Sequence, residues 1–360
     1  PNLVYKGNKT RTQGFFPLKT TVLKDYILIL VTGGAGYIGS NLALRLLELG
    51  HNIVIFDNLS TGHIEIINKL KNLDLKGKIV DFIKGDLKNL QEIESALSKY
   101  KFEAIFHFAA FSIVSESAKN PSIYWENNFL GTKNLLDAMK KFNINKIVFS
   151  STAATYGEPN YVPIDENHPQ RPINAYGNTK LALEFLMDDY SKAYGIRSAR
   201  LRYFNVIGAD KFQRTGEWHE TETHLVPNIL KSLNTKGKTF NIFGNTYNTK
   251  DGTCVRDYIV MDDLINAHIK ALEYLNNGGK TDFFNLGTKE GNSVLEVIQT
   301  AEEVTGQKIS YEIKEKREGD PAILIADNKK AKEILNWQPE KTLKEGIESA
   351  YNWEKANFYK

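Results

Sequence analysis

Short apolar runs alternate with amphipathic stretches from residue 27 to about residue 201 of the 360-residue chain. The apolar runs predict strands at 27–32, 51–56, 78–84, 104–108, 146–150 and 197–201. The amphipathic stretches predict helices at 40–50, 90–100, 122–142 and 175–194. Such alternation is typical of an α/β fold with a Rossmann-like, doubly wound parallel sheet.

The pattern loosens after about residue 210. Further strands are predicted at 238–243 and 282–286, and further helices at 262–275, 293–305 and 342–353. We therefore expect a Rossmann-like domain over 27–209 and a smaller α/β substrate-binding lobe over 210–360 that is discontinuous, with segments returning to the first domain. The polar, mildly basic stretch 1–26 is an N-terminal extension to which the sequence assigns no role.

The composition argues against a nucleic-acid-binding protein and against a membrane protein. A chain with 41% hydrophobic residues can bury a full core, and a net charge of +3 from 46 basic and 43 acidic residues gives no stripe for nucleic acid. Cys254 is the single cysteine, which agrees with a reducing compartment. No run reaches the roughly 20 apolar residues of a membrane span. We expect a soluble, cytoplasmic protein with no membrane or nucleic-acid partner and no metal.

A glycine-rich turn follows the first predicted strand. Gly33, Gly36 and Gly39 stand in a GxxGxxG spacing, one residue different from GxGxxG, directly before a helical pattern. Glycines there allow a tight turn, close approach of the backbone to a pyrophosphate, and packing of helix on strand, while the helix N-terminus attracts the anion. The turn predicts a dinucleotide site.

Asp57 ends the second predicted strand, where an acid can hold a ribose diol. Its carboxylate would repel a 2′-phosphate, so it favours NAD over NADP. The alternative is that Asp57 only shapes the turn that it forms with Asn58.

Tyr176 and Lys180 stand four residues apart on a predicted helix and so share one face. Lowering a phenol pKa from about 10 to near neutrality requires about 4 kcal/mol. A cation about 4 Å away supplies about that much at an effective dielectric of about 20, before the cost of desolvation, which opposes both charges. A positively charged nicotinamide ring nearby would help further. We expect Lys180 to lower the pKa of Tyr176, which then acts as a base. The alternative is a surface Tyr/Lys pair on an amphipathic helix.

Thr152 follows the strand predicted at 146–150 and would place its hydroxyl near the same pocket. We expect it to hydrogen-bond the reacting hydroxyl of the substrate. The alternative is that it caps the following turn.

These motifs resemble the extended short-chain dehydrogenase/reductase family, and within it the branch of the UDP-glucose 4-epimerases, from about residue 27 to the C-terminus. The segments that carry the resemblance are Thr32–Ser40, Gly85–Leu87, His107–Ala110, Ser150–Thr152, Tyr156–Gly157, Tyr176–Lys180, Leu201–Asn205, Phe243–Asn245, Asp251–Thr253, Val255–Tyr258 and Arg317–Asp320.

The resemblance implies a reaction. Tyr176 as phenolate takes the proton of the sugar 4-OH, hydride moves from C4 to the nicotinamide, and the resulting 4-keto sugar turns over and receives hydride on its other face. Because nothing is consumed, NAD is expected to stay bound.

It also implies binding residues. Those expected to hold NAD are Gly33, Gly36, Tyr37, Ile38, Gly39, Asp57, Asn58, Asp86, Leu87, Phe108, Ala109, Ala110, Asn127, Ser150, Tyr176, Lys180, Tyr203 and Phe204. Those expected to hold the UDP-sugar are Ser112, Thr152, Asn205, His224, Leu225, Asn241, Phe243, Arg256, Tyr258, Arg317, Asp320 and Leu324. Arg256 and Arg317 suit a diphosphate, which guanidinium groups bind in bidentate fashion.

Some positions depart from the best-known bacterial epimerases. Ser112 stands where lysine is frequent, Val206 where proline is common, and His224 where asparagine is common. Leu324, at the position that closes the hexose pocket, is neither the tyrosine associated with plain hexoses nor the small residue associated with N-acetyl sugars. We hypothesise activity on both sugar classes.

Two other functions remain open at this point. A sugar-nucleotide 4,6-dehydratase needs an Asp-Glu pair after the threonine, where this chain has Ala153 and Ala154. A non-catalytic NAD sensor typically lacks the tyrosine or the lysine, and both are present. The resemblance further implies a homodimer built from helices at 89–100 and 122–142.

Overall fold

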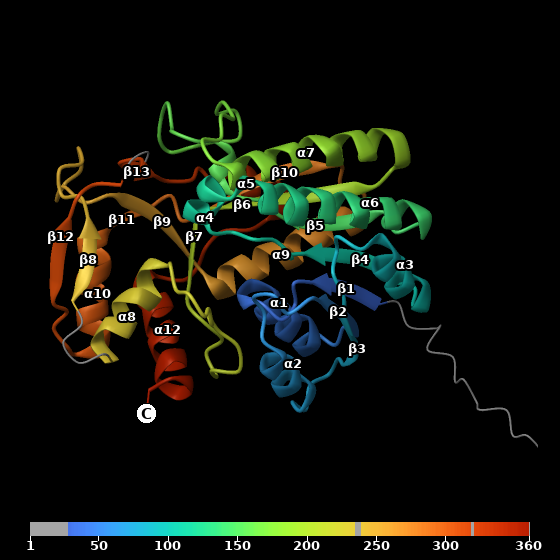
Figure 1. Ribbon diagram of the computed structural model, residues 1–360, viewed down its shortest axis with the longest axis horizontal. Helices are drawn as coiled ribbons and strands as arrows, with labels where there is room; N and C mark the ends of the chain where they lie inside the picture. The colour runs from blue at the N-terminus through green and yellow to red at the C-terminus, as the bar shows by residue number, and fades with distance from the viewer. Residues whose placement is uncertain (1–27, 235–238, 318–319, 360) are drawn as a thin grey trace, which may run out of the picture.

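The computed structural model describes residues 28–234, 239–317 and 320–359, so the extension predicted for 1–26 lies outside the described residues. A seven-stranded sheet in which every pair is parallel forms the centre of the molecule (Figure 1), in the order β3-β2-β1-β4-β5-β6-β10. Its strands are β1 (Leu28–Thr32), β2 (Ile53–Asp57), β3 (Ile79–Lys84), β4 (Phe102–His107), β5 (Lys146–Ser150), β6 (Arg197–Tyr203) and β10 (Asp282–Leu286). The predicted Rossmann-like fold class is confirmed.

Alternate residues of each strand pack on opposite faces of this sheet. In β1, Ile29 and Val31 join one apolar core and Leu28 and Leu30 join another. The first core packs beneath α1 (Tyr37–Glu48), α2 (Ile64–Lys71), α9 (Met261–Asn276) and α11 (Lys329–Leu335). The second packs beneath α3 (Leu90–Lys99), α6 (Gly131–Lys141) and α7 (Ala175–Tyr194). Burial on both faces explains why the strands are continuous apolar runs.

The helix predicted over 122–142 is not regular. It comprises α5 (Pro121–Tyr124), the π-helical segment η2 (Trp125–Leu130) and α6. Within η2 the buried Asn128 accepts a hydrogen bond from the backbone N–H of Phe111 at 2.8 Å and donates one to its carbonyl at 2.9 Å. Apolar periodicity cannot reveal such a segment, which proteins often use beside functional sites.

The remaining elements form a second group around a third apolar core. Its strands are β7 (Asn205–Ile207), β9 (Val255–Val260), β11 (Gly291–Ser293) and β13 (Ile323–Leu324) in one sheet and β8 (Phe240–Phe243) with β12 (Tyr311–Lys314) in another. Its helices are α8 (Leu225–Asn234), α10 (Val294–Thr305) and α12 (Leu343–Asn357). Two short helices outside this group, α4 (Val114–Lys119) and η3 (Ala153–Thr155), lie nearer the large sheet. The domain limits 27–209 and 210–360 stay a prediction.

No helix in the described part of the chain combines the length and apolar character that crossing a bilayer requires.

A buried ion pair ties α7 to the sheet. Glu184 on α7 and Arg202 on β6 are 2% and 1% exposed, and Arg202 Nε donates to Glu184 Oε1 at 2.9 Å. The Arg202 guanidinium also lies 3.9 Å from the ring centroid of Phe283 on β10. Both charges are therefore satisfied inside the protein.

Removing one partner of this pair should be costly, because the other charge stays buried. We expect Glu184→Ala to lower the free energy of unfolding by about 3–5 kcal/mol. Glu94→Ala, which breaks the surface pair with Lys141 (Glu94 27% and Lys141 58% exposed), is the matched control and should cost about 0–1 kcal/mol. Urea unfolding measures the free energy of unfolding of both variants. Equal decreases would contradict the stabilising role given to the buried Glu184–Arg202 pair.

Candidate active site

The turn between β1 and α1 requires glycine at two positions. Gly33 has φ +69°, and a Cβ there would lie 2.6 Å from the backbone nitrogen of Ala109. A Cβ on Gly39 would lie 2.1 Å from the carbonyl oxygen of Gly33. Gly36 precedes α1 and no side chain caps the first turn of that helix. The turn therefore presents a helix N-terminus that suits a phosphate group.

Asp57 lies at the carboxyl end of β2 and is buried. Its Oδ2 accepts from the backbone N–H of Ala35 at 3.0 Å and its Oδ1 from that of Leu59 at 2.8 Å. Burial raises the pKa of this carboxyl, and the two hydrogen bonds oppose the rise. Asp57 thus shapes the turn, as the alternative held, and also lines the cavity.

Lys180 points from α7 towards the end of β5. Its Nζ donates to the carbonyl oxygen of Ser150 at 2.6 Å and lies 5.9 Å from the ring centroid of Tyr176. Burial lowers the pKa of Lys180 to about 7, against an opposing effect of Glu184. Burial therefore disfavours the charged form of this side chain.

The expected lowering of the Tyr176 pKa by Lys180 is not found when only the residues of the protein act on the phenol. Burial raises the pKa of Tyr176 to about 12, and a hydrogen bond with Thr152 is what lowers it. Desolvation disfavours the phenolate more strongly than the hydrogen bond with Thr152 favours it. Additional stabilisation of the phenolate is needed for base chemistry near neutrality.

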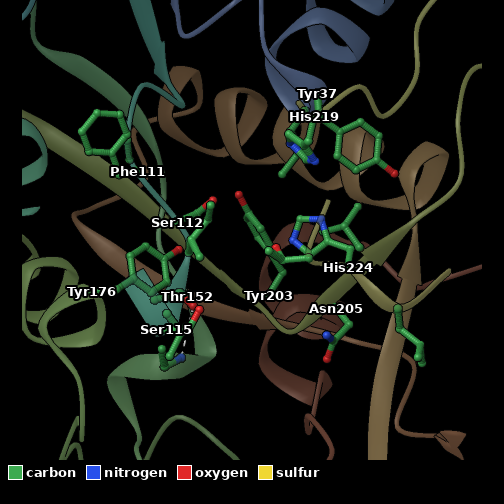
Figure 2. Close-up of a pocket in the computed structure, with 18 of the residues that line it drawn as sticks. Tyr37, Phe111, Ser112, Ser115, Thr152, Tyr176, Tyr203, Asn205, His219 and His224 are labelled. Atoms are coloured by element: carbon green, nitrogen blue, oxygen red, sulfur yellow. Dashed lines mark hydrogen bonds between the residues drawn. The ribbon is translucent and has the colours of Figure 1, made fainter. Parts of the chain in front are cut away.

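Thr152 has the capping role that was considered for it. Its Oγ1 accepts from the backbone N–H of Ala154 at 3.1 Å and so caps η3. Figure 2 shows Thr152 beside Tyr176, with Ser112 nearby. Thr152 also lines the cavity, and its role towards a substrate hydroxyl stays a prediction.

The buried ion pair described above also supports this segment. Ser151 Oγ donates to Glu184, and Arg202 Nη1 donates to the hydroxyl of Tyr156 at 2.8 Å. Tyr156 in turn donates to Asn285 at 2.6 Å. These hydrogen bonds hold the segment from β5 to η3 in place.

The two arginines predicted for a diphosphate have different surroundings. Arg256 is 9% exposed and forms an ion pair with Asp320. Arg317 lies with its guanidinium carbon 3.9 Å from the ring centroid of Phe243. Leu324 on β13 pairs with Arg256 on β9. These residues form one wall of the active-site cavity.

One cavity of about 1210 Å³ unites these groups. Every residue predicted for cofactor or substrate lines it. The loops after β1 to β4 supply Gly33, Gly36, Tyr37, Ile38, Gly39, Asp57, Asn58, Asp86, Leu87, Phe108, Ala109, Ala110 and Ser112. The segments from η2 to β7 supply Asn127, Ser150, Thr152, Tyr176, Lys180, Tyr203, Phe204 and Asn205. The later segments supply His224, Leu225, Asn241, Phe243, Arg256, Tyr258, Arg317, Asp320 and Leu324. A single small ligand usually occupies about 300–1,000 Å³, so this cavity has room for two.

Sequence reasoning missed several residues of the site. Phe111, Ser115 and His219 line the cavity and were not predicted. Glu184, which supports Ser151, could have been found, because it stands four residues after Lys180 on the same helix.

The chain matches the family profile described as GDP-mannose 4,6 dehydratase over residues 30–350. It is 45% identical over 325 residues to a UDP-glucose 4-epimerase of Rhizobium meliloti, covering 90% of this chain and 96% of that protein.

Two solved structures are also similar. One is UDP-glucose 4-epimerase from Brucella ovis in complex with NAD, with TM-score 0.85, 39% identity, and coverage of 91% of this chain and 98% of that one. The other is the UDP-Glc/GlcNAc 4-epimerase from Campylobacter jejuni, with TM-score 0.79, 40% identity, and coverage of 92% and 99%. With a glycine turn, a Tyr/Lys pair and a threonine on one cavity, and with relatives this similar over nearly their whole length, the chain belongs to the UDP-glucose 4-epimerase branch of the extended short-chain dehydrogenase/reductase family.

Proposed function

We propose that the protein is an NAD-dependent isomerase that interconverts UDP-glucose and UDP-galactose through a 4-keto sugar nucleotide. The observation that carries this proposal is the meeting of Tyr176, Lys180 and Thr152 in one cavity with the glycine turn. The names of the similar proteins support the reaction and the cofactor.

The residues present fit NAD. Side chains at Gly33 and Gly39 would clash with the backbone of Ala109 and of Gly33, so these glycines permit the tight turn that dinucleotide sites use to approach a pyrophosphate. Asp57 is positioned for a ribose diol, and Tyr203 and Phe204 line the cavity near Ser150. When bound, NAD supplies a hydride acceptor for C4 and returns the hydride later.

Proton transfer falls to the protein. Tyr176 accepts the proton of the sugar 4-OH and gives it back to the product. Thr152 hydrogen-bonds the reacting oxygen and favours the phenolate. Lys180, held by the Ser150 carbonyl, adds positive charge to the extent that it is protonated. Together these groups lower the barrier to removing a hydroxyl proton at neutral pH.

Elimination of water is disfavoured although the matching family profile is described as a dehydratase. Ala153 and Ala154 line the cavity directly after Thr152, at the positions where a dehydratase carries its Asp-Glu pair. Alanine can neither donate nor accept a proton.

Substrate breadth depends on the wall near β13. Leu324 lines the cavity with a side chain of intermediate size. A neighbour with 40% identity is described as acting on both UDP-Glc and UDP-GlcNAc. We infer that this protein also interconverts UDP-GlcNAc and UDP-GalNAc.

The homodimer and the cytoplasmic location remain predictions. Trp125 and Leu130 are 40% and 42% exposed on η2, within the helical region expected to form the dimer contact. Sedimentation equilibrium tests the dimer, and a monomer mass would contradict it.

Replacing the base should remove most of the activity. We expect Tyr176→Phe to lower kcat by about 10²–10⁴-fold, because general base catalysis is lost. Tyr194→Phe, at a 48% exposed tyrosine of the same helix, should leave kcat unchanged. A coupled assay of UDP-galactose conversion measures both variants. Undiminished activity of Tyr176→Phe would exclude the proposed role.

The hydroxyl of Thr152 should determine how kcat depends on pH. Its hydrogen bond lowers the pKa of Tyr176, so Thr152→Val raises that pKa and reduces the phenolate fraction at neutral pH. We expect kcat to fall at least about tenfold and its acid limb to move up by about 1–2 pH units. Thr152→Ser keeps a hydroxyl and should retain the original limb. Identical pH profiles in all three proteins would contradict this role.

Leu324 should control acceptance of acetamido sugars. The unmodified protein is expected to turn over both UDP-Glc and UDP-GlcNAc. Leu324→Tyr should reduce UDP-GlcNAc turnover by about tenfold or more with a much smaller effect on UDP-Glc. Chromatography of equilibrated sugar nucleotides measures both substrates. Complete inactivity of the unmodified protein on UDP-GlcNAc removes the proposal.

A further inference from the structure

Two histidines and two glutamates meet on the segment that joins β7 to α8. Glu217, His219, Glu222 and His224 each offer one ligand atom, and these atoms all lie within 4.8 Å of one another. Figure 2 shows His219 and His224 close together beside Tyr37. Both histidines line the active-site cavity, so the cluster forms part of its wall.

The spacing of these atoms resembles that of a tetrahedral metal site. Glu217 Oε1 lies 3.3 Å from His219 Nδ1, and Glu222 lies 3.6 Å from each histidine through a different oxygen, Oε2 to His219 Nδ1 and Oε1 to His224 Nδ1. Ligands bound to Zn²⁺ at about 2.0–2.2 Å in a tetrahedron are roughly 3.3–3.6 Å apart. The contact of His224 Nδ1 with Glu217 is closer, a hydrogen bond that a metal ion would replace.

A third carboxyl group is buried close to this cluster. Glu354 on α12 is 3% exposed, and its Oε2 has no hydrogen-bond partner among the described residues. It lies close enough to Glu222 and Glu217 for the three carboxyl groups to repel one another. A cation in the cluster would reduce this repulsion.

The segment that carries the cluster connects distant parts of the molecule. Trp353 on α12 donates through Nε1 to the carbonyl oxygen of Glu217 at 2.7 Å. Trp218 stacks on His63, which precedes α2, with ring centroids 3.9 Å apart. A metal ion here would hold the cavity wall in one conformation relative to both helices.

We propose that Glu217, His219, Glu222 and His224 bind one divalent transition-metal ion, with Zn²⁺ the best fit, and that the ion fixes this wall of the cavity. Mixed imidazole and carboxylate ligands suit Zn²⁺. Four protein ligands leave no open position, so the ion is structural and takes no part in hydride or proton transfer. No metal was predicted from the sequence, although residues 217–224 carry the spacing Glu-x-His-x-x-Glu-x-His.

Zinc binding by the whole purified protein tests the proposal. After treatment with a chelator, the protein is given Zn²⁺, freed of excess by gel filtration and analysed by elemental mass spectrometry. We expect about one zinc per chain, and isothermal titration with Zn²⁺ should show at least a tenfold loss of affinity in His219→Ala and in Glu222→Gln. His51→Ala, at an exposed histidine outside the cluster, is the matched control and should bind zinc as the unmodified protein does.

X-ray absorption at the zinc edge keeps the test independent of how the variants fold. The unmodified protein should show two imidazole nitrogens and two oxygens at about 2.0–2.2 Å. Absence of stoichiometric zinc, or a shell of six oxygens, would overturn the proposal and leave a cluster of ion pairs between histidines and glutamates. Because neither readout is activity, failure here is distinguishable from failure of the proposed epimerase function.

Discussion

The cost of ionising a buried phenol governs the chemistry that this site can perform. Burial raises the pKa of Tyr176 to about 12, so forming the phenolate near neutrality requires about 7 kcal/mol at about 1.4 kcal/mol per pH unit. Lys180 cannot supply all of this. A full charge about 6 Å from the ring centroid contributes about 3 kcal/mol at an effective dielectric of about 20, and burial disfavours the charged form of this lysine. The pKa of about 12 already includes the hydrogen bond with Thr152, so the remaining source is the positive charge that a bound nicotinamide would supply.

The fold brings these sources together because all its central strands are parallel. Their carboxyl ends meet along one edge, where Gly33 follows β1, Asp57 ends β2, and Ser150 and Thr152 end and follow β5. The close approach of Gly33 to Ala109 shows how little space separates the loops that follow β1 and β4. The Glu184–Arg202 pair then fixes the segment that carries Thr152. The positions of the site residues are thus set by the parallel sheet and by the buried Glu184–Arg202 ion pair.

Much of this arrangement could be predicted from the sequence, and the exceptions have physical causes. Apolar runs predicted the strands of the central sheet and β8, but not β7, β9, β11, β12 or β13, and the motif residues following the central strands all line one cavity. The π-helical segment around Asn128 escaped prediction because it does not change the apolar pattern. The size of the desolvation cost at Tyr176 could not be predicted, because spacing shows which charge is near but not how much water is lost. The residues 217–224 were passed over because their convergence depends on how a loop folds back, which periodicity does not encode.

Ultraviolet difference spectroscopy of Tyr176 tests the central claim most directly. The protein with NAD bound is titrated from pH 5 to 10, and the phenolate absorbance of Tyr176 is obtained by subtracting the spectra of Tyr176→Phe. The account predicts that Tyr176 ionises near neutrality in this complex, several units below the pKa set by the protein alone. A phenol that stays neutral to pH 10 while the unmodified protein epimerises UDP-sugars at pH 7 would contradict it.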